Sequence, residues 1–314
     1  MRRRHYHLLP IVIIISVCSF ACKQEAQEPT KPIIPTSGDG ASYIEYLKGN
    51  MPLILTVSHG GSEKPEWIKN RVCQDAVNVQ DEFTLELAKE IVDALAENGT
   101  YKPFVILNKL HRSKVDLNRN RLDGTCGDPH SQKAYDAFHG FIQEAKTRIA
   151  QQFSKGILID IHGHGHEVQR IELGYLLYEE ELRVNDDALN QAPLLSYSSI
   201  QHIAQNNLKK LTHAELVRGP SAFGTLLQNQ GFNSVPSKDI PYPQIDEPYF
   251  SGGYITATYG SYSGGTMDAI QMECNREQVR DSVASRKAFA KAFVASILEY
   301  LQTNYFEEIP QSKD

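Results

Sequence analysis

Four short apolar stretches rich in β-branched residues recur along the chain, and each predicts a buried β-strand. Longer segments between them carry apolar residues at spacings of three and four, which is the pattern of helices that bury one face. The strand-like stretches cover residues 52–58, 103–110, 156–161 and 269–274. The helical patterns cover residues 81–97, 132–153 and 281–300.

This alternation of strands and long helices predicts the fold class. Strands joined through helices imply crossover connections and a mostly parallel sheet that is covered on both faces. We therefore expect a three-layer α/β/α fold around a mixed, mostly parallel central sheet. Residues 171–250 have a mixed pattern that is harder to place. A single folded domain over residues 42–314 is the simplest interpretation.

The first 21 residues have the pattern of a secretory signal. Three arginines, beginning at Arg2, precede an apolar run over residues 8–21. That layout is typical of an export signal, and the run is short for a membrane-spanning helix, which needs about 20 apolar residues. We therefore expect residues 1–21 to direct export and not to belong to the fold.

The end of this run is similar to a bacterial lipobox, in which a cysteine becomes the lipid-bearing first residue of the mature chain. That cysteine is Cys22, and plain signal cleavage nearby is the alternative. Residues 22–41 are rich in proline, glycine and charge without periodicity, which predicts a tether. We expect a protein of the periplasm or cell envelope that is attached to the membrane through Cys22.

The net charge bears on the class of binding partner, and the cysteines bear on whether a disulfide forms. The formal net charge is −6, and removing residues 1–21 takes away three arginines and no acids, which gives about −9. Nothing in this balance predicts a nucleic-acid partner. In an exported protein Cys73 and Cys126, both in polar loops, are the expected disulfide pair, whereas Cys274 is expected to lie in a buried strand.

Polar side chains capable of chemistry directly follow the strand-like stretches. His59 follows the first, His111 and Arg112 follow the second, and Asp160 and His162 close the third. In parallel sheets the functional groups gather beyond the carboxyl ends of the strands. We therefore expect these residues to share one cleft.

His59 and the acidic pair Asp81 and Glu82 each have a simple structural interpretation as well as a functional one. His59 precedes two glycines that would let the backbone turn away from a bound ion, but a histidine at a strand end is more often only hydrogen-bonded. Asp81 and Glu82 open a predicted helix, where carboxylates cap backbone N–H groups. A carboxylate at that position is also well placed as a metal ligand, and the residues alone do not separate the two roles.

The segment HRSKVDLNRNR, residues 111–121, is either a solvated basic loop or a self-supporting polar network. Within it, Arg119 could hold a substrate carboxylate through two parallel hydrogen bonds, which favours a substrate that carries a carboxylate. The members of the expected network are Arg112, Asp116, Asn118, Arg119 and Arg121.

The segment GILIDIHGHGH places three histidines at alternate positions after a strand. Asp160 and His162 share the side of the strand opposite three isoleucines, so Asp160 could hold the imidazole in one tautomer. His164 and His166 lie beyond glycines, and the strand does not fix their directions. We rank His162 as a metal ligand, His164 as a pocket residue and His166 as neither.

Glu273 lies within the apolar stretch AIQMEC, on the same side as Gln271. A lone buried carboxylate is costly, so Glu273 must be paired or lie next to a metal. One interpretation is a structural salt bridge with an arginine such as Arg276. The other is a general base that takes a proton from an attacking water molecule.

Taken in order, six motifs resemble those of the N-formylglutamate amidohydrolase family, relatives of the zinc carboxypeptidases. They are SHGG, DEFTLELA, HRSKVDLNRNR, LIDIHGHG, GGYITATYG and IQMECNRE, and they span residues 55–277. The resemblance implies one zinc ion bound by His59, Asp81 and His162, with Glu273 as the general base.

The resemblance also implies how a substrate would be bound. Asn118 and Arg119 match the pair that holds a substrate carboxylate, with Arg112 as the preceding arginine. Gly252, Gly253 and Tyr254 fall in the loop that closes over the substrate.

One departure concerns the carboxylate ligand. Carboxypeptidases place a glutamate three residues after the first histidine, a position that is Ser62 here, with Glu63 one step further. The ligand role is therefore assigned to Asp81, with Glu82 and Glu63 as the alternatives.

The resemblance implies zinc-dependent hydrolysis of a C–N amide bond in an N-formyl or N-acyl amino acid such as N-formylglutamate. Because formylglutamate arises in the cytoplasm and the chain has an export signal, a metallocarboxypeptidase or amidase acting on peptides or cell-wall fragments is an alternative. A third possibility, from another class, is a non-catalytic envelope lipoprotein whose HGHGH segment binds metal.

Overall fold

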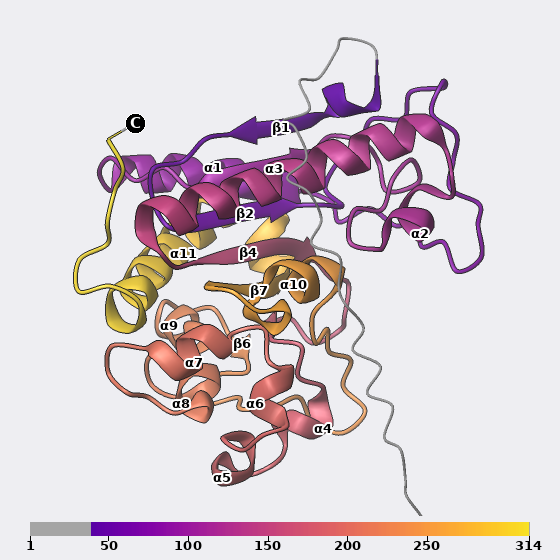
Figure 1. The fold of residues 1–314 in the computed structure, drawn as a ribbon. Coiled ribbons are helices and arrows are strands. Elements are labelled where there is room, and N and C mark those ends of the chain that lie inside the picture. Colours follow the sequence, from indigo (N-terminus) through magenta and orange to yellow (C-terminus); the bar gives the residue numbers. More distant parts are fainter. Residues whose placement is uncertain (1–38, 314) are drawn as a thin grey trace, which may run out of the picture. The chain divides into compact units, whose positions relative to one another are not determined.

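The computed structural model describes residues 39–313, and in them a seven-stranded sheet carries helices on both faces (Figure 1). The strand order across the sheet is β1-β3-β2-β4-β7-β5-β6. The strands are β1 (Ile44–Leu47), β2 (Leu53–Val57), β3 (Phe104–Asn108), β4 (Gly156–Gly163), β5 (Ile171–Gly174), β6 (Ser234–Val235) and β7 (Met267–Cys274). Strands β3, β2, β4 and β7 are parallel, whereas β1 pairs antiparallel with β3 and β5 pairs antiparallel with β7. The predicted mixed, mostly parallel sheet is confirmed.

The four predicted strands correspond to β2, β3, β4 and β7, the four parallel strands in the middle of the sheet. Every residue of β2, β3 and β7 is buried, as expected of strands covered on both faces. Strand β4 continues two residues beyond the predicted end, to Gly163. His162 therefore lies inside the strand, and the sheet itself fixes the direction of its side chain.

Side chains that alternate along the central strands divide the interior into two cores. Ile157, Ile159 and Ile161 of β4 belong to one core, while Leu158 belongs to the other. Asp160 and His162 follow the same alternation as Leu158, and in β7 Gln271 and Glu273 follow the same alternation as Ala269 of that second core. The polar residues of the predicted site thus lie on one face of the sheet.

Long helices cover the two faces. Helices α1 (Thr84–Glu97) and α11 (Val283–Asn304) pack against each other on the face of the first core, and α3 (Pro129–Phe153) covers the other face together with α10 (Tyr254–Tyr259) (Figure 1). Helix α3 begins where Asp128 accepts hydrogen bonds from two backbone N–H groups and Pro129 occupies the first turn. The predicted helices are all present.

The segment that the pattern left unassigned, residues 171–250, forms β5, β6 and six short helices (Figure 1). Strands β5 and β6 lie at the edge of the sheet beyond β7. None of these helices exceeds seven residues, which is too short for the spacing of apolar residues to stand out. The helices are α4 (Glu179–Leu182), α5 (Asp186–Leu189), α6 (Leu194–Tyr197), α7 (Gln201–Asn206), α8 (His213–Arg218) and α9 (Phe223–Asn229), and α2 (Arg121–Thr125) is a further short helix before α3.

The predictions on the export signal and on Cys22 lie outside the described residues. The described part begins at Asp39, and Gly40–Tyr43 form a short 3-10 helix in which Ala41 is buried. Packed structure is therefore present in the last residues of the segment assigned to the tether. Among residues 39–313, no helix combines the length and the hydropathy needed to cross a bilayer.

Candidate metal centre and active site

Two imidazoles and a carboxylate meet at the carboxyl ends of β2 and β4. His59 lies two residues beyond β2, His162 is the penultimate residue of β4, and Asp81 precedes α1. One ligand atom from each of the three lies within 4.8 Å of the others, and all three residues are buried. The two imidazole rings meet edge to face with their centroids 4.8 Å apart. This group, called here the first cluster, has the composition and spacing of a metal site.

Asp81 reaches the first cluster because α1 begins later than predicted. The helix starts at Thr84, after Phe83 adopts a left-handed conformation with φ of 65°. The Asp81 N–H donates to the His59 carbonyl at 3.1 Å, and the Asp81 carboxylate accepts from the Gly163 N–H at 3.2 Å. The prediction that Asp81 and the next residue open the helix is therefore wrong, since this carboxylate contacts β4 and does not cap α1.

The other two carboxylates considered as ligands point elsewhere. The Glu82 side chain is 52% exposed and pairs with Arg276 at 3.0 Å. Glu63 is exposed, and its backbone bridges to Leu110. Of the three candidates, Asp81 belongs to the first cluster.

Each imidazole of the first cluster is held through one nitrogen by a buried aspartate. His59 Nε2 lies 2.7 Å from Asp116 Oδ1, and His162 Nε2 lies 2.8 Å from Asp160 Oδ2. Such carboxylate contacts fix the tautomer and orientation of a metal-binding histidine. The Nδ1 atoms of both rings face Asp81 instead, at 3.5 Å for His59 and 3.0 Å for His162. The two Nδ1 atoms and an Asp81 oxygen are therefore the expected ligand atoms.

The residues of the first cluster fit a bound cation. His59 Nδ1 is buried and has no hydrogen-bond partner among the described residues, which is unfavourable unless an ion or ligand contacts it. Burial opposes ionisation of His162, but the charge and hydrogen bond of Asp160 outweigh it and raise the pKa of His162 well above its ordinary value. The surroundings of this imidazole therefore favour positive charge, which a bound cation can supply in place of the proton. Two imidazoles and one carboxylate are the donor set of a zinc site that keeps a position open for substrate.

Glu273 lies beside the first cluster. In the parallel pairing of β4 with β7 it is the partner of His162, and its Oε1 lies 4.0 Å from His162 Nδ1. Gln271 donates a hydrogen bond to the same oxygen at 2.9 Å. Burial raises the pKa of the Glu273 carboxyl. The interpretation as a salt bridge with Arg276 is wrong, because that arginine pairs with Glu82 on the surface.

The fold has solved counterparts. A gene product of Agrobacterium tumefaciens is similar with a TM-score of 0.50 at 10% identity, over 83% of this chain and 95% of that one. An N-formylglutamate amidohydrolase of Ralstonia eutropha is similar with a TM-score of 0.49 at 12% identity, over 83% of this chain and 98% of that one. No family model and no curated protein matches the sequence. At these identities the similarity concerns the fold.

Asp116 is the centre of the polar network predicted for residues 111–121. Its buried carboxylate contacts Arg112 Nε at 3.0 Å and Arg119 Nε at 3.3 Å, in addition to His59. Arg121 does not belong to this network, since it pairs with Asp136 at 2.7 Å on the surface. The Arg119 side chain is 31% exposed, and its Nε lies next to the Asp116 carboxylate. Its guanidinium group carries two further nitrogens that could donate to a substrate carboxylate.

Asn118 connects this loop to the sheet and to the glycine loop before α10. Its amide nitrogen lies 3.3 Å from Gln271 Oε1 and 3.3 Å from His162 Nε2. Its amide oxygen accepts from the Ile255 N–H at 2.8 Å. A Cβ on Gly253 would lie 2.4 Å from the Asn118 amide nitrogen, so any other residue at this position would displace the Asn118 amide.

The remaining residues of the predicted loop lie next to this contact. Gly252 has φ of 130°, a conformation that side chains disfavour, and Tyr254 begins α10 with its ring 5.8 Å from that of His139. The structure thus brings Gly253 and Asn118 together, while Tyr254 packs toward α3.

Three other histidines that follow the predicted strands do not join the first cluster. His164 Nε2 lies 2.8 Å from the Arg170 carbonyl, and His166 Nδ1 lies 2.9 Å from Glu172 Oε1. His111 contacts Ser113 in its own loop. Of the residues expected to share one cleft, His111 therefore lies outside the first cluster.

Sequence reasoning did not find Arg71, which supports the loop around Asp116. Arg71 is buried, donates to the carbonyls of Arg112 and Asp123, and lies 3.7 Å from the Asp116 carboxylate. The predicted disulfide between Cys73 and Cys126 is present and ties this segment to the end of α2. A lone arginine in an irregular loop carries no signal of such a role.

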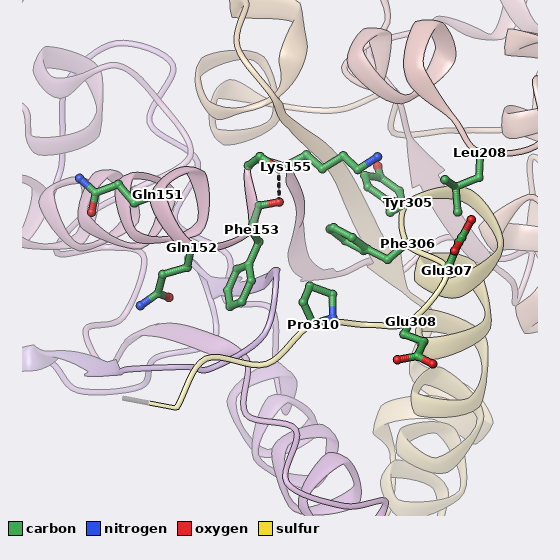
Figure 2. A pocket seen from close by; sticks show the side chains of 11 residues that line it. Gln151, Gln152, Phe153, Lys155, Leu208, Tyr305, Phe306, Glu307, Glu308 and Pro310 are labelled. Atoms are coloured by element: carbon green, nitrogen blue, oxygen red, sulfur yellow. Dashed lines mark hydrogen bonds between the residues drawn. The ribbon is translucent and has the colours of Figure 1, made fainter.

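A wide surface hollow lies at the opposite end of β4. It is lined by the end of α3, by Lys155 and by the segment after α11, including Tyr305 and Phe306 (Figure 2). Lys155 lies over the Phe306 ring with its Nζ 5.4 Å from the centroid. Lys155 comes directly before β4 and His162 lies near its end, which places them about 20 Å apart at the usual rise of a strand. None of the predicted site residues lines it.

Proposed function

We propose that the protein is a zinc-dependent hydrolase of C–N amide bonds that acts on N-acyl amino acids such as N-formylglutamate. The observation that supports this most is the position of Glu273, a buried carboxylate 4.0 Å from His162 Nδ1. Its raised pKa suits a residue that must take up and release a proton.

His59, Asp81 and His162 would hold the ion. A zinc ion in such a site supplies Lewis acidity that polarises the scissile carbonyl and activates a water molecule. Asp116 and Asp160 keep the two imidazoles oriented through Nε2.

Glu273 removes a proton from the attacking water as the new C–O bond forms. It then delivers that proton to the leaving nitrogen as the C–N bond breaks, so the products are a carboxylic acid and an amine. Gln271 holds the Glu273 carboxylate through a 2.9 Å hydrogen bond, which limits its rotation away from the water.

Arg119, with Arg112 and Asn118, would bind the substrate carboxylate. The two arginines share Asp116, which neutralises part of their charge and keeps both guanidinium groups on one side of the first cluster. A guanidinium group binds a carboxylate through two parallel hydrogen bonds, which orients the substrate amide.

The direct test is hydrolysis by the purified, zinc-loaded protein of three substrate types: N-formylglutamate, other N-acyl amino acids and short acidic peptides. Release of an amine that stops with a chelator and returns with Zn²⁺ supports the proposal. Turnover of peptides alone would replace the acyl amino acid with a peptide as substrate. Absence of turnover on all three substrate types, with zinc bound, contradicts the hydrolase.

We also propose that the chain is exported and anchored through a lipid on Cys22. This rests on the residue pattern of positions 1–22, outside the described part of the structure. In bacterial cells, Cys22→Ser should abolish incorporation of labelled palmitate and leave the protein out of the membrane fraction. Equal labelling of the parent and the variant contradicts the anchor.

A further inference from the structure

A second group of possible metal ligands lies next to the first cluster. It comprises His164, His166 and Glu172, called here the second cluster, and one ligand atom from each lies within 4.8 Å of the others. His164 and His166 follow β4, whereas Glu172 belongs to β5. Two independent segments therefore converge on this point.

The ligand atoms of the second cluster are partly oriented. His164 Nε2 lies 2.8 Å from the Arg170 carbonyl, which fixes the proton on Nε2 and leaves Nδ1 as a lone-pair donor. His166 Nδ1 lies 2.9 Å from Glu172 Oε1, and its ring stacks on Phe250 with centroids 4.8 Å apart. His164 Nδ1 currently accepts from the His166 N–H at 3.1 Å, a bond that an ion would replace.

Glu172 makes this position favourable for a cation. Its side chain is fully buried, and its strand pairs antiparallel with β7 so that Glu172 lies directly opposite Glu273. Directly opposite residues point to the same face of a sheet, with Cβ atoms about 5 Å apart. Two buried carboxylates on the same face of neighbouring strands repel each other when both are ionised, and a positive charge beside Glu172 offsets the repulsion.

We propose that the second cluster binds a divalent transition-metal ion, with His164 Nδ1, His166 Nδ1 and Glu172 Oε1 as its protein ligands. Two imidazoles and one carboxylate favour Zn²⁺, Co²⁺ or Ni²⁺ over Mg²⁺ and Ca²⁺, which prefer all-oxygen sites. Glu273 then lies between two cations, since it pairs with His162 on one side and with Glu172 on the other. This site does not depend on the hydrolase activity.

The test is metal counting on the chelator-stripped, Zn²⁺-reloaded full chain. We expect two zinc ions per chain in the parent and one in His166→Gln and in Glu172→Gln. His162→Ala should also keep one, because it disrupts only the first cluster. The matched control is His202→Ala on α7, where the imidazole contacts Asn206, and it should keep two ions.

The number of zinc ions bound by the parent and by each variant shows which of the two clusters binds metal. A parent that binds one ion, with no change in His166→Gln or Glu172→Gln, overturns the proposal. A second ion that survives in both variants overturns it as well. A parent that binds one ion, lost in His166→Gln and kept in His162→Ala, supports the second cluster and contradicts the proposed hydrolase. Far-ultraviolet circular dichroism establishes that each variant is folded, and the half-buried His166 provides the less disruptive of the two changes.

Discussion

Strand β7 carries two buried carboxylates whose surroundings differ. Asp268, near its start, accepts hydrogen bonds from the Ser261 hydroxyl at 2.5 Å, the Tyr305 hydroxyl at 2.8 Å and the Ile203 N–H at 3.2 Å. Glu273, near its end, accepts from Gln271 and faces His162. Burial raises the pKa of both carboxyl groups.

The comparison shows that burial and a raised pKa do not by themselves identify an active site. Asp268 joins three segments of the chain and is enclosed by its donors, which is a structural role. Glu273 Oε1 instead lies 4.0 Å from Nδ1 of His162, a member of the first cluster. This position beside a group of possible metal ligands is what favours a catalytic role.

The largest expected effect is on catalytic activity, which should depend on Glu273 and not on Asp268. Glu273→Gln should lower kcat/KM on an accepted substrate by about 10² to 10⁴, the usual contribution of a general base, while the zinc content stays unchanged. Asp268→Asn is the matched control and should keep the parental rate. Steady-state kinetics with metal counting measures both, and a Glu273→Gln protein as fast as the parent removes the base from the scheme.

The second prediction concerns the contribution of Asp268 to the pH dependence of stability. Burial raises the pKa of Asp268 to about 7, so the folded state keeps its proton where the unfolded chain has lost it. The contribution of Asp268 to the free energy of unfolding therefore falls as pH rises from about 4 to about 7, by up to about 1.4 kcal/mol per pH unit.

Urea unfolding at several pH values measures this slope. Asp268→Asn should flatten it between pH 4 and 7, and an unchanged slope would assign the dependence to other groups.

The third prediction concerns the aspartates that orient the imidazoles. Asp160→Asn should weaken zinc binding at the first cluster by about 10-fold to 100-fold, because the amide no longer stabilises the Nε2 proton of His162. Binding at the second cluster should not change, since His164 is held by a backbone carbonyl. Competition with a chromophoric chelator measures both affinities, and equal weakening of the two would contradict separate sites.

The smallest expected effect concerns the substrate carboxylate. Arg119→Lys should raise KM about tenfold with little change in kcat, because lysine cannot make two parallel hydrogen bonds to a carboxylate. Arg121→Lys is the control, as Arg121 pairs with Asp136 on the surface. If both variants raise KM equally, Arg119 has no specific role in binding.

The central sheet and much of the first cluster could be predicted because strand alternation and strand ends are local features of the sequence. Asp160 and His162 share a face through the period of two, and the parallel sheet brings His59 beside them. The choice of Asp81 over Glu82 and Glu63 came from a resemblance, and its physical reason is the left-handed Phe83 that delays α1.

Other parts of the site depend on contacts that no local pattern encodes. Glu172 lies in a four-residue strand within the segment without clear periodicity, so its place opposite Glu273 could not be predicted. Nothing in the sequence distinguishes Arg121 and Arg276 from the arginines that contact Asp116. In the structure each of the two pairs with a surface carboxylate. The pairing partners of long, flexible side chains follow from tertiary packing.

The most direct test of the first cluster is anomalous diffraction at the zinc absorption edge from crystals of the zinc-loaded protein. We predict an ion within bonding distance of His59 Nδ1, His162 Nδ1 and an Asp81 carboxylate oxygen, with Nε2 of both imidazoles still bound to Asp116 and Asp160. An ion held through Nε2, or anomalous density that contacts neither His59 nor His162, would contradict the account.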